Sequence, residues 1–379
     1  MKKILKIFFV NILVLFAFLE ASSYLGVKSG LFIHPSVPTY NMKSSFIGVN
    51  WRNERENWGA WHKKNAVDRA VTSCFDVEYK SNNVGARDDR DYSSLESTRS
   101  ENIVLIGDSF AEGHGVNINE TFAKYLEEYT GKIVLNFGSG GNFGPLQEFI
   151  IYRDLASNFQ HNEFIFFFVP RNDFTDNSSK YQNTLFKKRY RPYFSRDSLT
   201  KEFSIYYPED SQPSDQYPSA SLADYSWSNY LRLVLVNYTY SANLVRTTKQ
   251  IITSTALGNR NLSLGGYYYE DQESVEGTLH YIHELFLLVP RPVKKAIIVI
   301  PDELDLYKIK NVGKTYENLA WFRGMKNIAE IFDANLIDLA AQENIEPEDF
   351  VKKWFLPCDA HWSPDGHKMA SDVYIKKTR

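Results

Sequence analysis

The sequence is poor in cysteine, in metal-binding motifs and in excess charge of either sign. It has two cysteines in 379 residues and no CxxC or HExxH pattern, so the common zinc-site spacings are absent. Lysine and arginine (43) nearly balance aspartate and glutamate (46), and no long basic stripe occurs. This composition lacks the electrostatic footprint of a nucleic-acid-binding protein. We therefore expect no metal, no other cofactor and no nucleic-acid partner.

The two cysteines, Cys74 and Cys358, form an even pair, which an oxidising compartment can bridge. A bridge would tie the N-terminal part of the chain to the segment that begins at Asp359. The alternative is a pair of buried, unbridged thiols.

The N-terminus has the pattern of a membrane-targeting segment. Three lysines within the first six residues precede the apolar run Ile7–Leu19, a pattern that keeps the N-terminus in the cytoplasm and exports the more C-terminal residues. The run is shorter than the ~20 residues that span a bilayer, and continuing it to Val27 includes Glu20. An uncleaved anchor and a signal peptide cleaved near Ala21-Ser22-Ser23 both remain open. Either way, residues 1–27 direct the rest of the chain out of the cytoplasm, to the periplasm or cell surface.

Residues 28–100 are polar and irregular, yet they contain large aromatic side chains that need burial: Trp51, Trp58, Trp61 and Phe75. We expect them to form an extracytoplasmic lead-in that packs on the main domain, residues 101–379.

From residue 101 onward, short apolar runs alternate with helical patterns. The expected strands are 103–106, 132–137, 164–169, 296–300 and 335–339, and the expected helices are 121–129, 146–159, 316–331 and one that opens at Ser363-Pro364. Such alternation predicts an α/β fold with a parallel sheet covered by helices on both faces.

A long stretch, about 178–290, separates the two halves of this pattern and includes expected helices around 222–250 and 271–288. It is longer than a connection between sheet elements needs, so we interpret it as a mixed insertion over the carboxyl edge of the sheet. Its start is basic and aromatic, and we consider Arg191 and Tyr193, together with Arg171, as substrate-binding candidates. A solvated, packed insertion without a binding role is the alternative.

Four polar or glycine-rich segments lie where ligands bind in a doubly wound sheet. Gly107-Asp108-Ser109 follows the first strand, the turn ending at Gly141 follows the second, and Asn172 follows the third, while Asp359-Ala360-His361 lies near the C-terminus. Each segment alone is more typical of a turn or a cap. Together they supply a nucleophile, oxyanion donors, a general base and its orienting acid, the roles that acyl transfer requires.

Two Asp-x-His pairs stand close together near the C-terminus. His367 falls in the first turn of the expected last helix, where Asp365 is explained as a helix-end acid. His361 lies in the preceding loop and can reach the sheet edge, so we predict His361 as the base, oriented by Asp359. We interpret the other histidines, including His114, His161, His280 and His283, as surface or packing residues.

In order along the chain, these segments resemble the four signature blocks of the SGNH (GDSL-like) hydrolases, over roughly 75–175 and 295–379. The segment 78–88 also resembles the lead-in of membrane-anchored bacterial members. The resemblance implies a three-layer α/β/α sandwich, the triad Ser109, Asp359 and His361, and an oxyanion hole made by the backbone N–H groups of Ser109 and Gly141 with the Asn172 side chain. Two features depart from the family pattern: Pro170 stands where glycine is usual, and Asp-x-x-His has become Asp-x-His, as in some extracytoplasmic polysaccharide O-acetyltransferases.

Three functions are therefore considered. The first is a serine esterase that acts through an acyl-enzyme on O-acylated glycans or small acyl esters. The second is an O-acetyltransferase that passes the acyl group to a sugar hydroxyl, although no multi-span module is present to deliver acyl groups. The third is a non-catalytic carbohydrate-binding module, which has no need of all four residue types together.

Overall fold

The computed structural model describes most of the chain. The residues described are 2–29, 31, 37–40, 51–72, 74–93, 101–141, 143–179, 189–209, 211–214, 226–246, 248, 272–302, 305–306, 315–341, 353–356 and 359–378.

A five-stranded parallel sheet organises the fold, with the strand order β11-β10-β7-β5-β6. The strands are β5 (Ile103–Ile106), β6 (Val134–Asn136), β7 (Glu163–Phe168), β10 (Lys294–Val299) and β11 (Ala334–Asp338). The central strands are buried on both faces, which is why they are continuous apolar runs without alternation. The chain leaves β5 toward β6 on one side and later returns to β7 on the other, so the sheet reverses its winding direction between β5 and β7.

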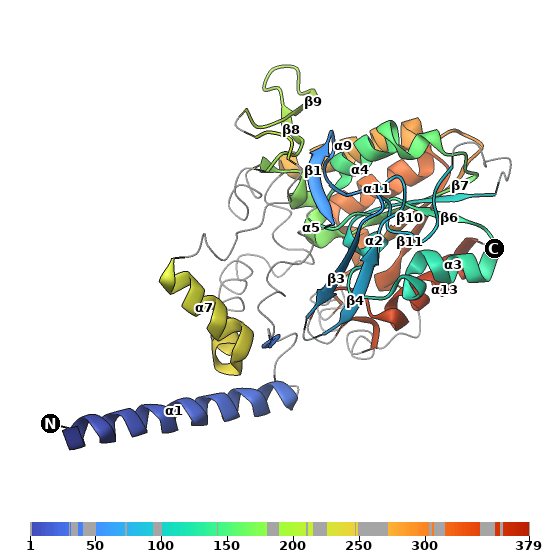
Figure 1. Cartoon of the computed structure of the whole chain (residues 1–379). Helices are drawn as coiled ribbons and strands as arrows, with labels where there is room; N and C mark the ends of the chain where they lie inside the picture. The colour runs from blue at the N-terminus through green and yellow to red at the C-terminus, as the bar shows by residue number, and fades with distance from the viewer. Residues whose placement is uncertain are drawn as a thin grey trace.

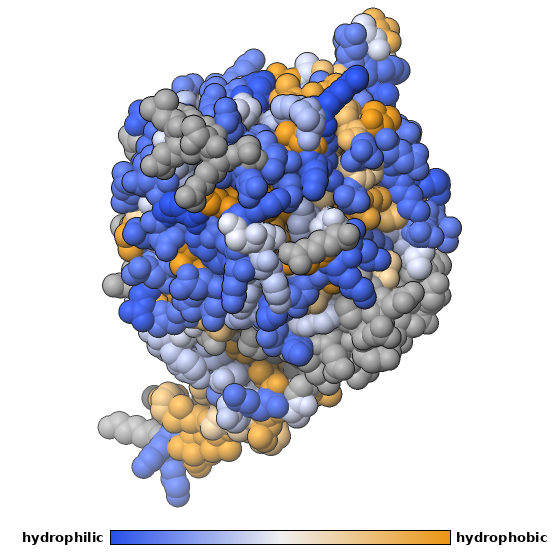
Figure 2. Space-filling view, turned by 90° about the vertical axis from the view of Figure 1, so that its right-hand side faces the viewer, coloured by the Kyte–Doolittle hydropathy of each residue, from blue (hydrophilic) through white to orange (hydrophobic). Residues whose placement is uncertain are grey.

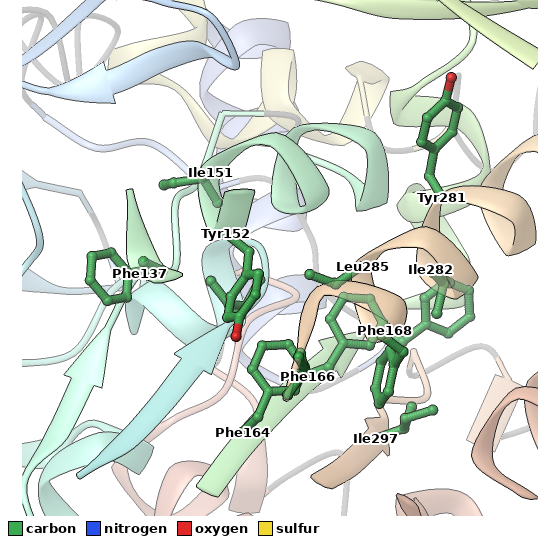
Figure 3. Close-up of a cluster of buried hydrophobic side chains, with 14 of the residues drawn as sticks. Phe137, Ile151, Tyr152, Phe164, Phe166, Phe168, Tyr281, Ile282, Leu285 and Ile297 are labelled. Carbon is green, nitrogen blue, oxygen red and sulfur yellow. The ribbon is translucent and has the colours of Figure 1, made fainter. Parts of the chain in front are cut away.

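Helices cover both faces of the sheet, as the alternating pattern predicts (Figure 1). One face is covered by α4 (Pro145–Asp154), α9 (Gln272–Leu288) and α11 (Ala320–Ile331), and the other by α3 (Phe122–Thr130) and α13 (Pro364–Thr378). Figure 3 shows the core between the sheet and the first of these helical layers, where aromatic side chains of β7 meet Ile282 and Leu285 of α9. The fold is therefore the expected three-layer α/β/α sandwich.

The lead-in forms two small antiparallel hairpins, β1 (Arg52–Glu56) with β2 (Gly59–His62) and β3 (Val67–Val71) with β4 (Asp76–Lys80). The four aromatic side chains expected to need burial are buried: Trp51, Trp58, Trp61 and Phe75. Trp58 and Trp61 belong to the same core cluster as residues of β5, β7 and α4, so the lead-in packs on the main domain.

The stretch 178–290 divides into parts with different surroundings. Residues 193–206 contain the hairpin β8 (Tyr193–Arg196) and β9 (Phe203–Tyr206), and α7 (Trp227–Tyr238) lies away from the sheet. By contrast, α9 packs on the sheet, with the Phe286 ring centroid 5.5 Å from that of Phe164 in β7. The sequence pattern places α9 within the insertion, whereas the structure makes it part of a helical layer.

The first helix, α1 (Lys2–Lys28), projects from the domain (Figure 1). Its segment Lys3–Lys28 is long and apolar enough to cross a membrane, and an 18-residue window within it has a mean hydropathy of 2.3. In Figure 2 the visible face of the domain is largely hydrophilic, while hydrophobic residues gather on the segment that projects at the bottom, where Figure 1 places α1.

Candidate active site

The strand-to-helix turn after β5 presents Ser109 at the start of a short helix, α2 (Ser109–Glu112). Asp108 caps this helix, because its side chain accepts a hydrogen bond of 2.9 Å from the Phe110 N–H. The position before Asp108 requires glycine, since a Cβ on Gly107 would lie 2.6 Å from the Cβ of Phe167 in β7. The local sequence thus brings the serine hydroxyl to the carboxyl edge of the sheet, beside the point where the winding reverses.

The loop before α13 brings His361 to this serine. The Ser109 Oγ lies 2.7 Å from His361 Nε2, within hydrogen-bond distance. His361 Nδ1 makes a short hydrogen bond with Asp359 Oδ1, which also accepts the His361 backbone N–H at 3.1 Å. The structure therefore brings Ser109, His361 and Asp359 into one hydrogen-bonded line.

The electrostatics of this line favour a charged acid beside a basic imidazole. Burial raises the pKa of Asp359, but His361 and His114 beside it outweigh burial and hold that pKa well below its usual range. Burial lowers the pKa of His361, and the Asp359 carboxylate outweighs this effect, so the pKa of His361 is raised. A raised pKa makes the imidazole a better proton acceptor toward Ser109.

His367 lies elsewhere and has a different environment. It is buried in α13, where its Nδ1 accepts the backbone N–H of Phe122 at 3.2 Å, and its ring packs edge-on against Trp362. Burial, Arg87 and His361 lower the pKa of His367 to about 3, so it stays neutral. The helix that holds His367 begins where the sequence predicts: the Ser363 side chain accepts the Gly366 N–H at 3.2 Å, as expected of the N-cap of α13.

The interpretation of His114 as a surface or packing residue is wrong. Its Nε2 lies 3.8 Å from Asp359 Oδ2, and its ring centroid lies 4.4 Å from that of His361. The Tyr79 hydroxyl accepts the Gly115 N–H at 2.8 Å and contacts His114 Nδ1 at 3.4 Å. His114 thus belongs to the site, with Nε2 facing the carboxylate that orients His361.

Among the residues the structure describes, His114, Asp359 and His361 lie close enough together to hold a metal ion. The ligand atoms of His114, Asp359 and His361 lie within 4.8 Å of one another. Both ring nitrogens of His361 already face partners, Ser109 and Asp359, so a metal there would compete with the hydrogen-bonded line.

Ser109 and Gly141, whose backbone N–H groups are expected to form the oxyanion hole, both line the pocket at this site. Gly141 has φ +93°, a left-handed conformation that favours glycine, and its carbonyl accepts a hydrogen bond of 3.0 Å from Arg189 Nη1. Within the described part of the chain, the N–H groups of Ser109 and Gly141 donate to no other group. Both are thus available to a developing oxyanion.

Asn172 lies in the first turn of α5 (Pro170–Asp176), which begins directly after β7. Its amide nitrogen donates hydrogen bonds of 3.0 Å to Asp108 Oδ2 and 3.0 Å to Asp176 Oδ2. An amide has two N–H donors, so one of these bonds must open or be shared before Asn172 can donate to an oxyanion.

A buried ion pair braces helix α2, which begins at Ser109, and no motif or periodicity in the sequence predicts it. The Glu112 carboxylate in α2 accepts from Arg52 Nη2 at 2.8 and 2.6 Å and from the backbone N–H of Gly140. Burial raises the pKa of Glu112, but Arg52 and His62 outweigh burial and hold it well below its usual range. This pair links β1, α2 and the Gly140–Gly141 turn.

The site opens into a pocket of about 440 Å³ lined by Ser109, His361, His114, Asn172, Arg52 and Arg171, among others. Arg171 lies at its rim, 3.9 Å from Asp302. The other two substrate-binding candidates do not line this pocket: Arg191 is buried and donates to the Asp176 carbonyl, and Tyr193 is buried in β8. Their burial makes both of them packing positions in this structure.

Cys74 is disulfide-bonded. The sequence contains one other cysteine, Cys358, which lies outside the described residues.

Comparison with known proteins adds little to this geometry. No family model and no curated protein matches the sequence. A solved crystal structure is similar at 15% identity and a TM-score of 0.37, covering 73% of this chain and 96% of its own. A second, the “putative lipolytic protein of G-D-S-L family from Desulfitobacterium hafniense DCB-2”, is 10% identical with a TM-score of 0.33, covering 73% and 98%. At these values neither likeness supports a conclusion about this chain.

Proposed function

We propose that this chain is a serine esterase of the SGNH type, which hydrolyses carboxylic esters through an acyl-enzyme. The observation that carries the proposal is the line from the Ser109 hydroxyl to His361 Nε2 (2.7 Å) and from His361 Nδ1 to Asp359. Nucleophile, base and orienting acid stand in the order that activates a serine.

In this mechanism His361 takes the proton of the Ser109 hydroxyl while Oγ attacks the ester carbonyl carbon. The carbonyl oxygen becomes an oxyanion that the N–H groups of Ser109 and Gly141 stabilise, with the Asn172 amide as a third donor. His361 then gives the proton to the leaving alcohol, and the acyl group remains on Ser109. Water, deprotonated by His361, attacks the acyl carbon, and His361 then returns this proton to Ser109 Oγ as the bond from Oγ to the acyl carbon breaks and the carboxylic acid leaves.

Asp359 stabilises the imidazolium that forms during each step. Its low pKa keeps it ionised while His361 is protonated. His114, on the other carboxylate oxygen, helps to hold this orientation.

We infer that α1 is retained as an uncleaved anchor and that the domain lies outside the cytoplasm. The Glu20 carboxylate accepts the backbone N–H groups of Tyr240 (2.5 Å) and Ser241 (2.9 Å). Ser23, within the candidate cleavage site, is only 4% exposed. Cleavage near Ala21-Ser22-Ser23 would remove the Glu20 contacts. As substrates we propose the O-acylated glycans and other small acyl esters of that compartment.

The test is a substrate screen on the purified full-length protein in detergent. Nitrophenyl esters of increasing acyl length and acetylated glycans are offered beside the Ser109→Ala variant. The proposal predicts release of acid by the wild type and none by the variant. Equal rates for the two proteins would refute it, and transfer of the acyl group to an added sugar in place of water would assign the chain to the acetyltransferases.

A further inference from the structure

Helix α7 presents an apolar face to its surroundings. Trp227, Tyr230, Leu231, Leu235 and Tyr238 are all exposed, Trp227 to 76%. At roughly 100° per residue these five side chains fall within an arc of about 140° on one side of the helix. The Trp227 and Tyr230 rings are stacked, with centroids 6.1 Å apart.

This face is unfavourable in water. Eight of the twelve residues of α7 are apolar or aromatic, and Arg232 carries its one charge. A contiguous apolar patch of this kind marks a surface that binds a partner or a membrane.

The helix is also too short to cross a bilayer. Twelve residues make a helix of roughly 18 Å, whereas the hydrocarbon core is about 30 Å thick. A short apolar helix with aromatic residues suits the boundary between headgroups and acyl chains.

Helix α7 is attached to the candidate membrane span. The backbone N–H groups just after it, at Tyr240 and Ser241, donate to Glu20 of α1, and the Tyr240 ring packs edge-on against Tyr24 at 5.2 Å. Figure 1 shows α1 and α7 together on one side of the molecule, away from the sheet. The attachment lies beyond the apolar run of α1 and near its outer end, the level at which a headgroup layer would stand.

We propose that α7 lies in the outer interface of the same bilayer that α1 spans, with Trp227 and Leu231 among the acyl chains nearest the headgroups. Tryptophan and tyrosine prefer this depth. The proposal rests on the inference that α1 is an uncleaved anchor. Two attachments would restrict rotation of the domain about α1 and hold the esterase site in a fixed orientation to the membrane.

The test uses the fluorescence of Trp227 in the full-length protein reconstituted into vesicles. Five other tryptophans are buried, namely Trp51, Trp58, Trp61, Trp321 and Trp362, and Trp354 is partly buried. Vesicles of phosphatidylcholine and phosphatidylglycerol are prepared with ordinary phosphatidylcholine or with one brominated near the headgroup end of its acyl chains. The chain has seven tryptophans, so the brominated lipid should remove only the part of the emission that Trp227 contributes, and the emission lost in Trp227→Phe gives the size of that part.

Matched variants assign this loss. Trp227→Phe should abolish it and Trp354→Phe should leave it intact. The pair Leu231→Glu with Leu235→Glu should abolish it while the protein still floats with the vesicles through α1. Ester hydrolysis, measured on the same samples, reports the catalytic proposal separately.

Three results would overturn the proposal. Quenching of Trp227 by aqueous acrylamide but not by brominated lipid would show that α7 faces water. Protection from both quenchers would show that a second copy or another protein covers it. A protein that does not float with the vesicles would refute the α1 anchor, and the role of α7 with it.

Discussion

Replacing His367 by glutamine should distinguish the buried histidine of α13 from His361, the base that we propose for Ser109. The His367 ring is buried, and its Nδ1 accepts the Phe122 N–H. Glutamine does not titrate and keeps an acceptor for that N–H group. We therefore expect His367→Gln to retain most activity at pH 7, whereas His361→Gln should lower kcat by roughly 10⁴-fold or more.

The pH dependence of the free energy of unfolding should distinguish wild type from His367→Gln. The pKa of His367 is lowered from 6.5 to about 3 in the folded protein. The unfolded chain therefore binds the proton more readily, and stability falls as the pH drops below about 6.5. Between pH 7 and pH 4 this one group should cost the wild type roughly 3 kcal/mol of unfolding free energy, a loss that His367→Gln should not show.

The assay is urea unfolding of the full-length protein in a non-ionic detergent, followed by tryptophan fluorescence at pH 7 and pH 4. The quantity of interest is the difference between wild type and His367→Gln, because the other titratable groups are the same in both proteins. The same pH dependence in the two proteins would show that His367 is not held neutral. A folded His367→Gln protein without activity would contradict the purely structural role that we assign to His367.

Three other substitutions test separate parts of the site. Asp359→Asn should lower kcat by roughly 10⁴-fold. It should also shift the acid limb of the kcat/KM profile to lower pH, because the carboxylate that raises the pKa of His361 is gone; an unmoved limb would contradict this coupling. Asn172→Ala should lower kcat by roughly 10²–10³-fold with little change in KM, whereas a loss of thermal stability with unchanged kcat would leave Asn172 as only a bridge between Asp108 and Asp176. Glu112→Gln should destabilise the fold by roughly 3–5 kcal/mol, because Arg52 would remain buried beside a neutral partner; an unchanged Tm would show that this pair does not brace helix α2.

Much of the sheet can be predicted from the sequence because local composition determines it. The apolar runs predict strand β5 with its observed bounds and β7 to within one residue, since strands buried on both faces must be unbroken apolar runs. The position of His361 follows similarly from the Ser363-Pro364 helix start, which leaves the preceding loop free to reach the sheet edge.

The parts that sequence patterns miss depend on contacts between distant segments. His114 reaches Asp359 only because the turn after α2 and the loop before α13 meet at the sheet edge, and its place five residues after Ser109 does not by itself predict this contact. Arg52 and Glu112 pair across 60 positions of sequence. For α9 the periodicity correctly indicates a helix, but a hydrophobic period does not specify which layer the helix joins.

The central claim is that Ser109 is the nucleophile, and covalent labelling tests it most directly. The full-length protein is treated with a fluorophosphonate, and its intact mass and the modified peptide are determined by mass spectrometry, with Ser109→Ala as the matched control. We expect one adduct per chain, on Ser109 in the wild type, and no adduct on a Ser109→Ala protein that keeps the wild-type fold by circular dichroism. Labelling of the variant at the wild-type rate, or an adduct on another residue of the wild type, would contradict the account.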